Sequence, residues 1–408
     1  MSGAMGRGKS NTKAGIMATT MLLTAAIGLR GLAQQTHIGY KPAADAESKK
    51  TLLLRDFQPE PSLHVSVHEV RKAKFPVIDV HTHTNDAVGI GDRVDPKEMI
   101  ARMDRLNIKT IVILTGMWGE KLQTIIDNMV KPHPGRFIVF TEFDWSKLND
   151  RNFSQLMVQQ IDDSVARGAR GLKVRKELGL GVRDSSGKLI PIDDPRLDAA
   201  WEECGRLGIP VFIHSGDPEA FFHPIDARNE RYEELIEHPD WSFYGPQFPS
   251  LPELLAQRDR MFAKHPNTTF VALHFGSWPE NLDFVEQTLE RFPNVMIETG
   301  AREGELGRQS RRTRAVFMKY SNRIMFGTDE GAAESMYQNY FRWLETADEY
   351  FPYAQYSQQG RWMIYGLDLP DDVLENVYHR NAEGLFSRFK GLAQHPVSST
   401  GSYDSKIN

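Results

Sequence analysis

The stretch Phe75-Pro-Val-Ile-Asp-Val-His-Thr-His83 decides the fold of this chain. It is a short apolar, β-branched run that ends abruptly in polar residues, a pattern typical of a buried strand at its carboxyl end. Because side chains alternate along a strand, His81 and His83 should lie on the same side, with Cα atoms about 6.6 Å apart. Two imidazoles placed in this way can bind one cation at about 2.1 Å each. A chance pair of histidines in a turn is the alternative, and the rest of the chain decides between them.

Outward from this stretch, seven more short apolar runs follow, and helical periodicity separates them. They are residues 111–114, 137–140, 171–174, 209–214, 268–274, 295–297 and 324–329. Eight strands alternating with helices predict an α/β fold, a single closed (β/α)₈ TIM barrel over residues 75–390. An open doubly wound sheet is the alternative.

Two aromatic-rich insertions interrupt the repeating pattern, near residues 217–250 and 330–360. A long connection inside a compact domain is usually functional or disordered, and the aromatic content argues against disorder. We therefore predict that the first insertion is a lid over the barrel mouth. A packing or oligomer contact is the alternative, and a homo-oligomer is left open.

The ends of the chain have a different composition from the barrel. Residues 1–33 combine a basic start with a mostly apolar run of about 15 residues, too short to span a bilayer stably. We predict a signal peptide cleaved before Gln34, which makes the protein secreted or periplasmic, with no stable membrane span after cleavage. A disordered cytosolic tail or an uncleaved anchor is the alternative. Residues 34–74 form an N-terminal extension without a legible role, and residues 391–408 are predicted to be a disordered tail.

Charge and cysteine content exclude several classes of function. A net charge of −5 gives no electrostatic footprint for nucleic acid or an anionic membrane. The single cysteine, Cys204, excludes an intrachain disulfide framework and any cysteine-rich metal site. A metal ion would therefore be held by histidine, by carboxylate or by an oxygen derived from lysine.

Polar residues stand at the carboxyl ends of the predicted strands, where the chemistry of TIM barrels is located. They are His81, His83, Lys173, His214, His274 and Asp329. A single buried histidine is more often a hydrogen-bonded core residue than a ligand. A set that converges on one pocket without a ligand would be costly, because buried polar groups need partners.

This set resembles the amidohydrolase superfamily, and within it the amidohydrolase-related branch that includes aminocarboxymuconate semialdehyde decarboxylase. The resemblance covers roughly residues 75–386 and rests on five motifs, namely Asp79-Val-His-Thr-His83, Val211-Phe-Ile-His214, Leu273-His274, Phe326-Gly-Thr-Asp329 and Asn381-Ala382. It implies that His81, His83 and His214 are metal ligands. It also implies that Asp329 is a further ligand that handles the proton of a metal-bound water, and that His274 polarises the substrate or acts as an acid or base.

The resemblance also bears on the number of metal ions. Three imidazoles and a carboxylate suit a catalytic Zn²⁺ with an open position, and Zn²⁺ lowers the pKa of bound water to about 7. In two-metal members a lysine on the fourth strand is carbamylated and bridges the ions. The local Gly-Leu-Lys173-Val resembles the one-metal group more closely, so one divalent ion is favoured, and two are expected if Lys173 is carbamylated. The alternative role for Lys173 is to bind the carboxylate of a substrate with its positive charge.

Other candidates follow from residue type alone. Arg175, Arg228 and Arg302 could hold a carboxylate with two hydrogen bonds, and Trp241 could stack on a substrate ring. Surface ion pairs and core packing are the alternatives for these four residues.

The leading prediction for function is hydrolysis of a small ester, lactone or amide by a metal-bound hydroxide, with a substrate that bears a carboxylate. Non-oxidative decarboxylation of an aromatic or unsaturated acid at the same site is the alternative. A third hypothesis is a secreted barrel that only binds its ligand.

Overall fold

The computed structural model describes residues 48–85, 93–331, 333–353 and 359–387. The chain divides into two compact units, Met1–His64 and Val65–Asn408. In the first unit, the described residues contain the short helices η2 (Ser48–Thr51) and η3 (Leu54–Asp56). The predicted signal peptide and C-terminal tail lie outside the described residues. No helix in the described part of the chain is both long enough and apolar enough to cross a membrane.

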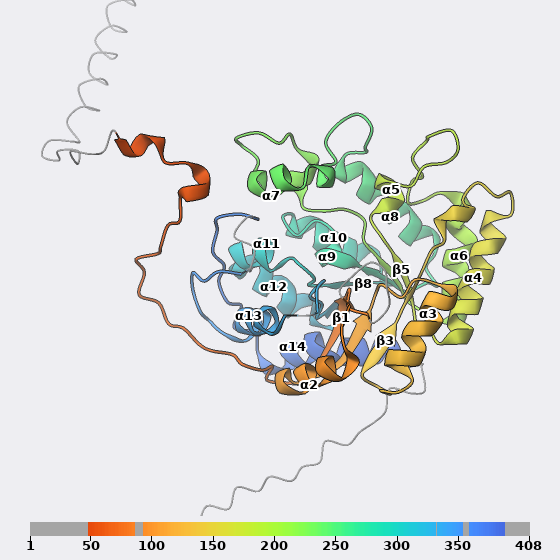
Figure 1. The fold of residues 1–408 in the computed structure, drawn as a ribbon, viewed down its shortest axis with the longest axis horizontal. Helices are drawn as coiled ribbons and strands as arrows, with labels where there is room; N and C mark the ends of the chain where they lie inside the picture. The colour runs from red at the N-terminus through yellow and green to blue at the C-terminus, as the bar shows by residue number, and fades with distance from the viewer. Residues whose placement is uncertain (1–47, 86–92, 332, 354–358, 388–408) are drawn as a thin grey trace, which may run out of the picture. The chain divides into compact units, whose positions relative to one another are not determined.

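The second unit is built on parallel strands at the positions that the apolar runs predict (Figure 1). The strands are β1 (Val77–Thr82), β2 (Ile108–Ile113), β3 (Phe137–Val139), β4 (Thr141–Glu142), β5 (Leu172–Val174), β6 (Val211–Ile213), β7 (Phe270–Ala272), β8 (Val295–Glu298) and β9 (Ile324–Met325). They form two ladders, β1-β2-β3 and β4 to β9, each in sequence order. Order and direction match the predicted α/β barrel.

The two ladders meet within one strand of the barrel. The run predicted at 137–140 is divided into β3 and β4 at Phe140, whose N–H donates to the carbonyl of Ile113 at 3.0 Å. The N–H of Thr141 instead donates to the carbonyl of Gly171 at 2.9 Å. One continuous segment therefore pairs with β2 through its first half and with β5 through its second.

Backbone hydrogen bonds also join the first strand to the last. The N–H of Val80 donates to the carbonyl of Phe326 at 3.0 Å, and the N–H of Asp329 donates to the carbonyl of His81 at 2.8 Å. Eight strand positions thus close on themselves, and the TIM-barrel prediction is confirmed.

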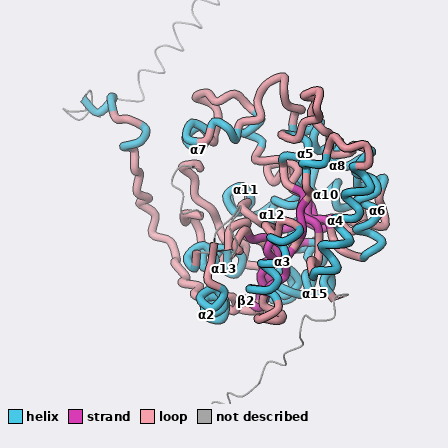
Figure 2. Tube along the Cα trace, turned by 45° about the vertical axis from the view of Figure 1, so that its right-hand side comes forward, coloured by secondary structure: helices cyan, strands magenta, loops and turns pink. Residues whose placement is uncertain are grey.

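Helices cover the outside of the strands (Figures 1 and 2). The main ones are α2 (Pro96–Leu106), α3 (Gly119–Ile125), α4 (Phe153–Arg167), α6 (Asp198–Leu207), α8 (Leu251–Lys264), α10 (Leu282–Arg291), α12 (Ser310–Tyr320), α13 (Glu334–Glu345), α14 (Asp371–Glu375) and α15 (Asn381–Phe386). The side chain of Asp95 caps α2 by accepting from the N–H groups of Lys97 and Glu98, and Asn107 ends it in a left-handed conformation with φ 63°. Both signals are local, so the bounds of this helix could be read from the sequence.

The apolar core has two parts, as expected for a barrel inside a ring of helices. Side chains from most strands fill the interior, and Ala382 and Phe386 of α15 pack against them. A larger cluster lies between the strands and the outer helices. The rigid frame positions the residues that follow each strand.

The two insertions differ in structure. Residues 217–250 contain three short helices, η7 (Glu219–Phe222), α7 (Tyr232–Glu237) and η8 (Pro239–Trp241). In contrast, the range 330–360 begins with the regular helix α13, which buries Tyr337, Tyr340, Phe341 and Trp343. The aromatic residues of the second insertion therefore belong to the core of the barrel unit.

Candidate active site

The site begins at the carboxyl end of β1, where His81 and His83 reach the same carboxylate. The Nε2 atoms of His81 and His83 lie 2.7 Å and 2.8 Å from Oδ1 of Asp329, which follows β9. The other oxygen of Asp329, Oδ2, lies 4.0 Å from Nε2 of His274, which follows β7. The side-by-side placement expected from alternation along β1 is therefore observed.

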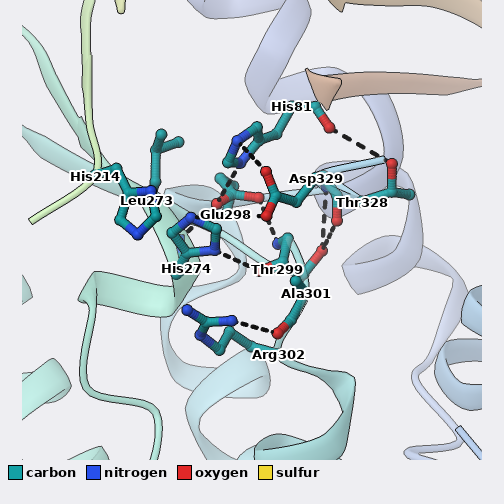
Figure 3. A network of polar contacts seen from close by, with 12 residues as sticks. His81, His214, Leu273, His274, Glu298, Thr299, Ala301, Arg302, Thr328 and Asp329 are labelled. Carbon is teal, nitrogen blue, oxygen red and sulfur yellow. Dashed lines mark hydrogen bonds and ion pairs between the residues drawn. The ribbon is translucent and has the colours of Figure 1, made fainter. Parts of the chain in front are cut away.

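His274 and Asp329 both have left-handed backbones, with φ of 56° and 68°. This conformation is uncommon for residues other than glycine and costs free energy, so it persists only where the surroundings impose it. It turns the chain sharply as β7 and β9 end, so that both side chains point toward His81 (Figure 3). Such strain is concentrated at functional sites.

Glu298, at the end of β8, orients two members of this group. Its Oε1 lies 3.2 Å from Nδ1 of His81 and accepts from the backbone N–H of His274 at 2.6 Å. The carboxylate is fully buried. Burial raises the pKa of Glu298, but the neighbouring His81 and the backbone donors hold it below its usual value, so the group stays ionised. The sequence analysis missed Glu298, although it ends an apolar run as the chosen residues do.

His214, after β6, lies beside this group with a different orientation. Its ring centroid is 4.1 Å from that of His274. Its Nε2, however, lies 3.1 Å from the carbonyl oxygen of Gly216 and 3.2 Å from Oδ1 of Asp217. The role of His214 as a metal ligand stays a prediction.

Lys173, on β5, is buried within the same group. Its Nζ lies 3.2 Å from Nε2 of His81. Burial lowers the pKa of Lys173 to about 8, with an opposing contribution from Asp329. The lysine thus lies beside the histidine cluster, as its place at a strand end predicts.

The donor set fits a divalent metal ion. Ligand atoms of His81, His274 and Asp329 all lie within 4.8 Å of one another, the one such group of histidine, cysteine or acidic residues found in the described ranges. Nδ1 of His83 and Nε2 of His274 are buried without a hydrogen-bond partner. Unpaired imidazole nitrogens next to a carboxylate are what a nitrogen- and oxygen-binding cation would satisfy. His274 therefore has the position of a ligand as well as that of the acid or base expected for it.

A cavity of about 570 Å³ opens beside this centre. Both His274 and Asp329 line it, and the insertion 217–250 contributes Phe221, Arg231 and Trp241 to its wall. The insertion therefore borders the barrel mouth, where a lid was expected.

Arg302 is a positively charged residue in the wall of this cavity. Its side chain is 6% exposed, and its Nη2 is 4.0 Å from Oδ1 of Asp217. Its Nη1 donates to the carbonyl of Ala301, and its Nε has no hydrogen-bond partner. Arg175 also has an unpartnered nitrogen, Nη2, but of the predicted arginines only Arg302 is among the residues that line this cavity.

The other predicted substrate contacts already have partners within the protein. Arg175 donates to Glu142 at 2.5 Å. The side chain of Arg228 is 90% exposed, pairs with Asp226 and is not among the residues that line this cavity, so its role in substrate binding stays a prediction. Trp241 lines the cavity, but His238 stacks on its ring at 4.1 Å with an interplanar angle of 13°. That contact occupies one face of the ring, and the role of Trp241 in stacking on a substrate stays a prediction.

Fold and site together define a TIM-barrel enzyme with a divalent metal centre at the carboxyl ends of its strands. A family model described as Amidohydrolase matches residues 78–388. The chain therefore belongs to the amidohydrolase superfamily, in the branch that the strand-end motifs predict, and it is a metal-dependent enzyme of that branch.

Three solved structures are similar to this chain. The uncharacterised TIM-barrel protein Bb4693 from Bordetella bronchiseptica aligns with a TM-score of 0.50 at 16% identity, over 77% of this chain and 99% of its own. 2,6-Dihydroxybenzoate decarboxylase from Rhizobium aligns with a TM-score of 0.48 at 15% identity, over 77% of this chain and 99% of its own. A probable 2-pyrone-4,6-dicarboxylic acid hydrolase from Acinetobacter baumannii aligns with a TM-score of 0.43 at 12% identity, over 77% of this chain and 100% of its own. No curated protein matches the sequence. At these identities the first similarity supports the barrel fold and nothing finer.

Proposed function

We propose that this enzyme hydrolyses a small ester, lactone or amide that carries a carboxylate. The observation that carries the proposal is the position of Asp329, which belongs both to the metal-binding group and to the wall of the cavity. A carboxylate in this place can take a proton from an attacking water and return it to the leaving group. Hydrolysis of an acyl bond requires both steps.

The residues around Asp329 have distinct roles in this proposal. His81, Asp329 and His274, with His83 and His214 beside them, would hold the metal ion. When bound, a divalent ion supplies an activated water and polarises the carbonyl of the substrate. Arg302 binds the carboxylate of the substrate, because its Nε–H is a buried donor without a partner in the described protein.

The test is a screen of the metal-loaded full chain against activated esters, lactones, amides and hydroxybenzoate-type acids. We expect turnover of carboxylate-bearing esters, lactones or amides without release of CO₂. Asp329→Asn should lower kcat/KM at least about 100-fold, in the range seen when a group acting in the transition state is removed. Asp127→Asn, on the exposed surface of the π-helix η4 (Ile126–Val130), is the matched control and should be silent. Release of CO₂ without hydrolysis would instead support the decarboxylase that the motifs leave open.

Two further proposals concern the metal and the location of the protein. We propose one Zn²⁺ per chain, because imidazole and carboxylate ligands with an open position suit this ion. Metal analysis should give one equivalent, and two equivalents together with the added mass of a carbamate on Lys173 would contradict this. We also propose export, and the mature protein should begin at Gln34 when its N-terminus is sequenced.

A further inference from the structure

A second, smaller cavity of about 210 Å³ adjoins the active-site cavity. The two share the lining residues Ala301, Glu330 and Gln359. The rest of the smaller wall is polar and aromatic: Glu303, Ser335, Asn339, Tyr340 and Tyr353, with Thr328, Met336 and Pro352. A substrate bound at the metal centre can therefore extend a second group into this space.

The two cavities differ in which charged side chains line them. The larger one is lined by the cations Lys176, Arg231 and Arg302, as well as by acids. The described lining of the smaller one contains Glu303 and Glu330 and no lysine or arginine. Any charged group recognised in the smaller cavity is therefore a cation.

Glu303 is a buried carboxylate that lacks a protein cation. It is 9% exposed, and its Oε2 accepts from the hydroxyl of Tyr340 at 2.7 Å. Within the described ranges it forms no ion pair. Burial, together with nearby acids, raises the pKa of Glu303 to about 7. An ionised carboxylate in such surroundings is costly until a positive group is placed next to it.

Tyr353 provides an independent indication of a ligand. The residue is 8% exposed, and its hydroxyl has no hydrogen-bond partner in the described protein. Its ring is fixed by packing, since it lies parallel to Trp362 at an interplanar angle of 7° and a Cβ on Gly304 would come within 2.8 Å of it. Tyr353 is thus held in the cavity lining, and the hydrogen-bonding capacity of its buried hydroxyl is unused, which costs free energy.

Ala301 separates this space from the carboxylate-binding side of the site. Its N–H donates to the hydroxyl of Tyr340 at 2.9 Å, on the side of Glu303, while its carbonyl accepts from Nη1 of Arg302. Glu303 and Arg302 are therefore reached from the two ends of one peptide unit, at Ala301, which lines both cavities.

We propose that the smaller cavity is a subsite for an alkylammonium group of the substrate. An ammonium has three N–H donors, and the carboxylates of Glu303 and Glu330 with the hydroxyl of Tyr353 supply acceptors for them. The metal-binding group found in the described ranges includes neither glutamate, so a metal ion is not the favoured occupant. Resting on the proposed function, this makes the substrate a zwitterion, with an amine on the Glu303 side and a carboxylate on the Arg302 side.

The first test measures binding without turnover. The metal-loaded full chain is titrated calorimetrically with n-butylammonium chloride and with n-butanol as the uncharged probe. We expect saturable binding of n-butylammonium only, weakened at least about ten-fold in Glu303→Gln, because a hydrogen bond between charged groups is lost. Glu345→Gln is the matched control, since Glu345 also accepts from a buried tyrosine hydroxyl, that of Tyr378, away from both cavities.

A second variant keeps the binding test decisive if Glu303→Gln does not fold. Tyr353→Phe removes only the unpaired hydroxyl and should weaken n-butylammonium binding several-fold. The proposal is overturned if n-butylammonium does not bind saturably, if n-butanol binds equally well, or if the variants at both positions bind like Glu345→Gln.

The second test separates this proposal from the proposed function. Two esters with the same scissile group, one ending in an ammonium and the other in a methyl group, are compared by kcat/KM. We expect kcat/KM to be at least about ten-fold higher for the ammonium ester than for the methyl ester. In Glu303→Gln this ratio should fall toward one. Equal turnover of the two esters overturns the subsite and leaves hydrolysis standing. Saturable n-butylammonium binding without turnover of any ester, lactone or amide overturns hydrolysis and leaves the subsite standing.

Discussion

Glu298 shows how a residue that is not in the metal-binding group can control it. One oxygen of its carboxylate contacts Nδ1 of His81 and the backbone N–H of His274, so it fixes the ring of the first and the backbone of the second. Partners of this kind set which imidazole nitrogen is free to bind a metal ion. The order along the chain hides this arrangement, because β1, β7 and β8 meet only in the folded barrel.

We therefore predict that Glu298→Gln lowers the affinity for the metal ion by about 10- to 100-fold, the usual cost of losing such a partner. Competition with a chelator, followed by metal analysis, measures the change. Glu345→Gln should keep the wild-type affinity. If Glu298→Gln binds metal as tightly as the wild type, the carboxylate does not orient His81.

Glu303 predicts a pH dependence of stability. Burial raises the pKa of its carboxyl from 4.5 to about 7 in the folded chain. Between these values the native state holds a proton that the unfolded state has released, so the free energy of unfolding falls as pH rises. The full effect is about 3 kcal/mol. Denaturation at pH 5 and pH 8 should show that Glu303→Gln gains stability relative to the wild type at the higher pH. A difference that does not change with pH would contradict this.

At the residue scale, the sequence predicts what depends on local spacing. His81 and His83 lie on the same side of β1 because side chains alternate along a strand. Asp329 lies next to them because the last strand of a barrel lies beside the first. The orientation of His214 and the left-handed turn at His274 depend on contacts with Asp217 and Glu298, which no local pattern specifies. The exposure of the Arg228 side chain could not be predicted either, because residue type does not show which side of a loop faces the solvent.

At the scale of elements, one lysine makes several of the contacts between the insertion 217–250 and the barrel, beside ion pairs such as that of Arg231 with Glu305. Nζ of Lys176 lies 2.5 Å from Oδ2 of Asp217, 5.8 Å from the ring centre of Trp241 and 5.5 Å from that of Phe243. A partly buried ion pair and two cation–π contacts therefore connect the insertion with the segment after β5. Because Phe221 and Trp241 line the cavity, the same contacts shape the mouth of the site.

We predict that Lys176→Met loosens this insertion. Amide hydrogen exchange across residues 219–243 should become about ten-fold faster, since the lost contacts are together worth about 1 to 2 kcal/mol. KM should rise as well. Lys188→Met, at an exposed position nearby in the chain, should leave both unchanged. Unaltered exchange in Lys176→Met would mean that other contacts, such as the buried ion pair of Arg231 with Glu305, hold the insertion.

The range 330–360 has a regular structure that its aromatic content did not specify. Helix α13 places Tyr337, Tyr340, Phe341 and Trp343 in the core. Their spacing is helical, but their density in a polar context obscures the apolar face. In contrast, α2 and α8 have capping residues at their first turns, Asp95 and Ser250, which are local signals in the sequence.

At the scale of the whole molecule, the barrel depends on a buried junction between its first and last strands. Asp79 of β1 is fully buried and accepts hydrogen bonds from the hydroxyls of Thr328 and Tyr337, each at 2.7 Å. It also accepts from the backbone N–H groups of His81 and Thr328. One carboxylate thus links β1 to the segment after β9 and to α13. Asp79 stands two residues before His81, and its partner Thr328 directly precedes Asp329.

We predict that Asp79→Ala lowers the free energy of unfolding by about 3 kcal/mol or more, because it leaves two hydroxyls and two N–H groups buried without an acceptor. Urea denaturation measures the change. Asp104→Ala is the control, since Asp104 forms a surface ion pair with Arg136, its side chain is 62% exposed, and such pairs contribute about 0 to 1 kcal/mol. Asp79→Asn keeps one acceptor oxygen and should fall between the two. If Asp79→Ala costs no more than Asp104→Ala, closure of the barrel rests on the backbone ladder alone, and the metal centre is positioned without this carboxylate.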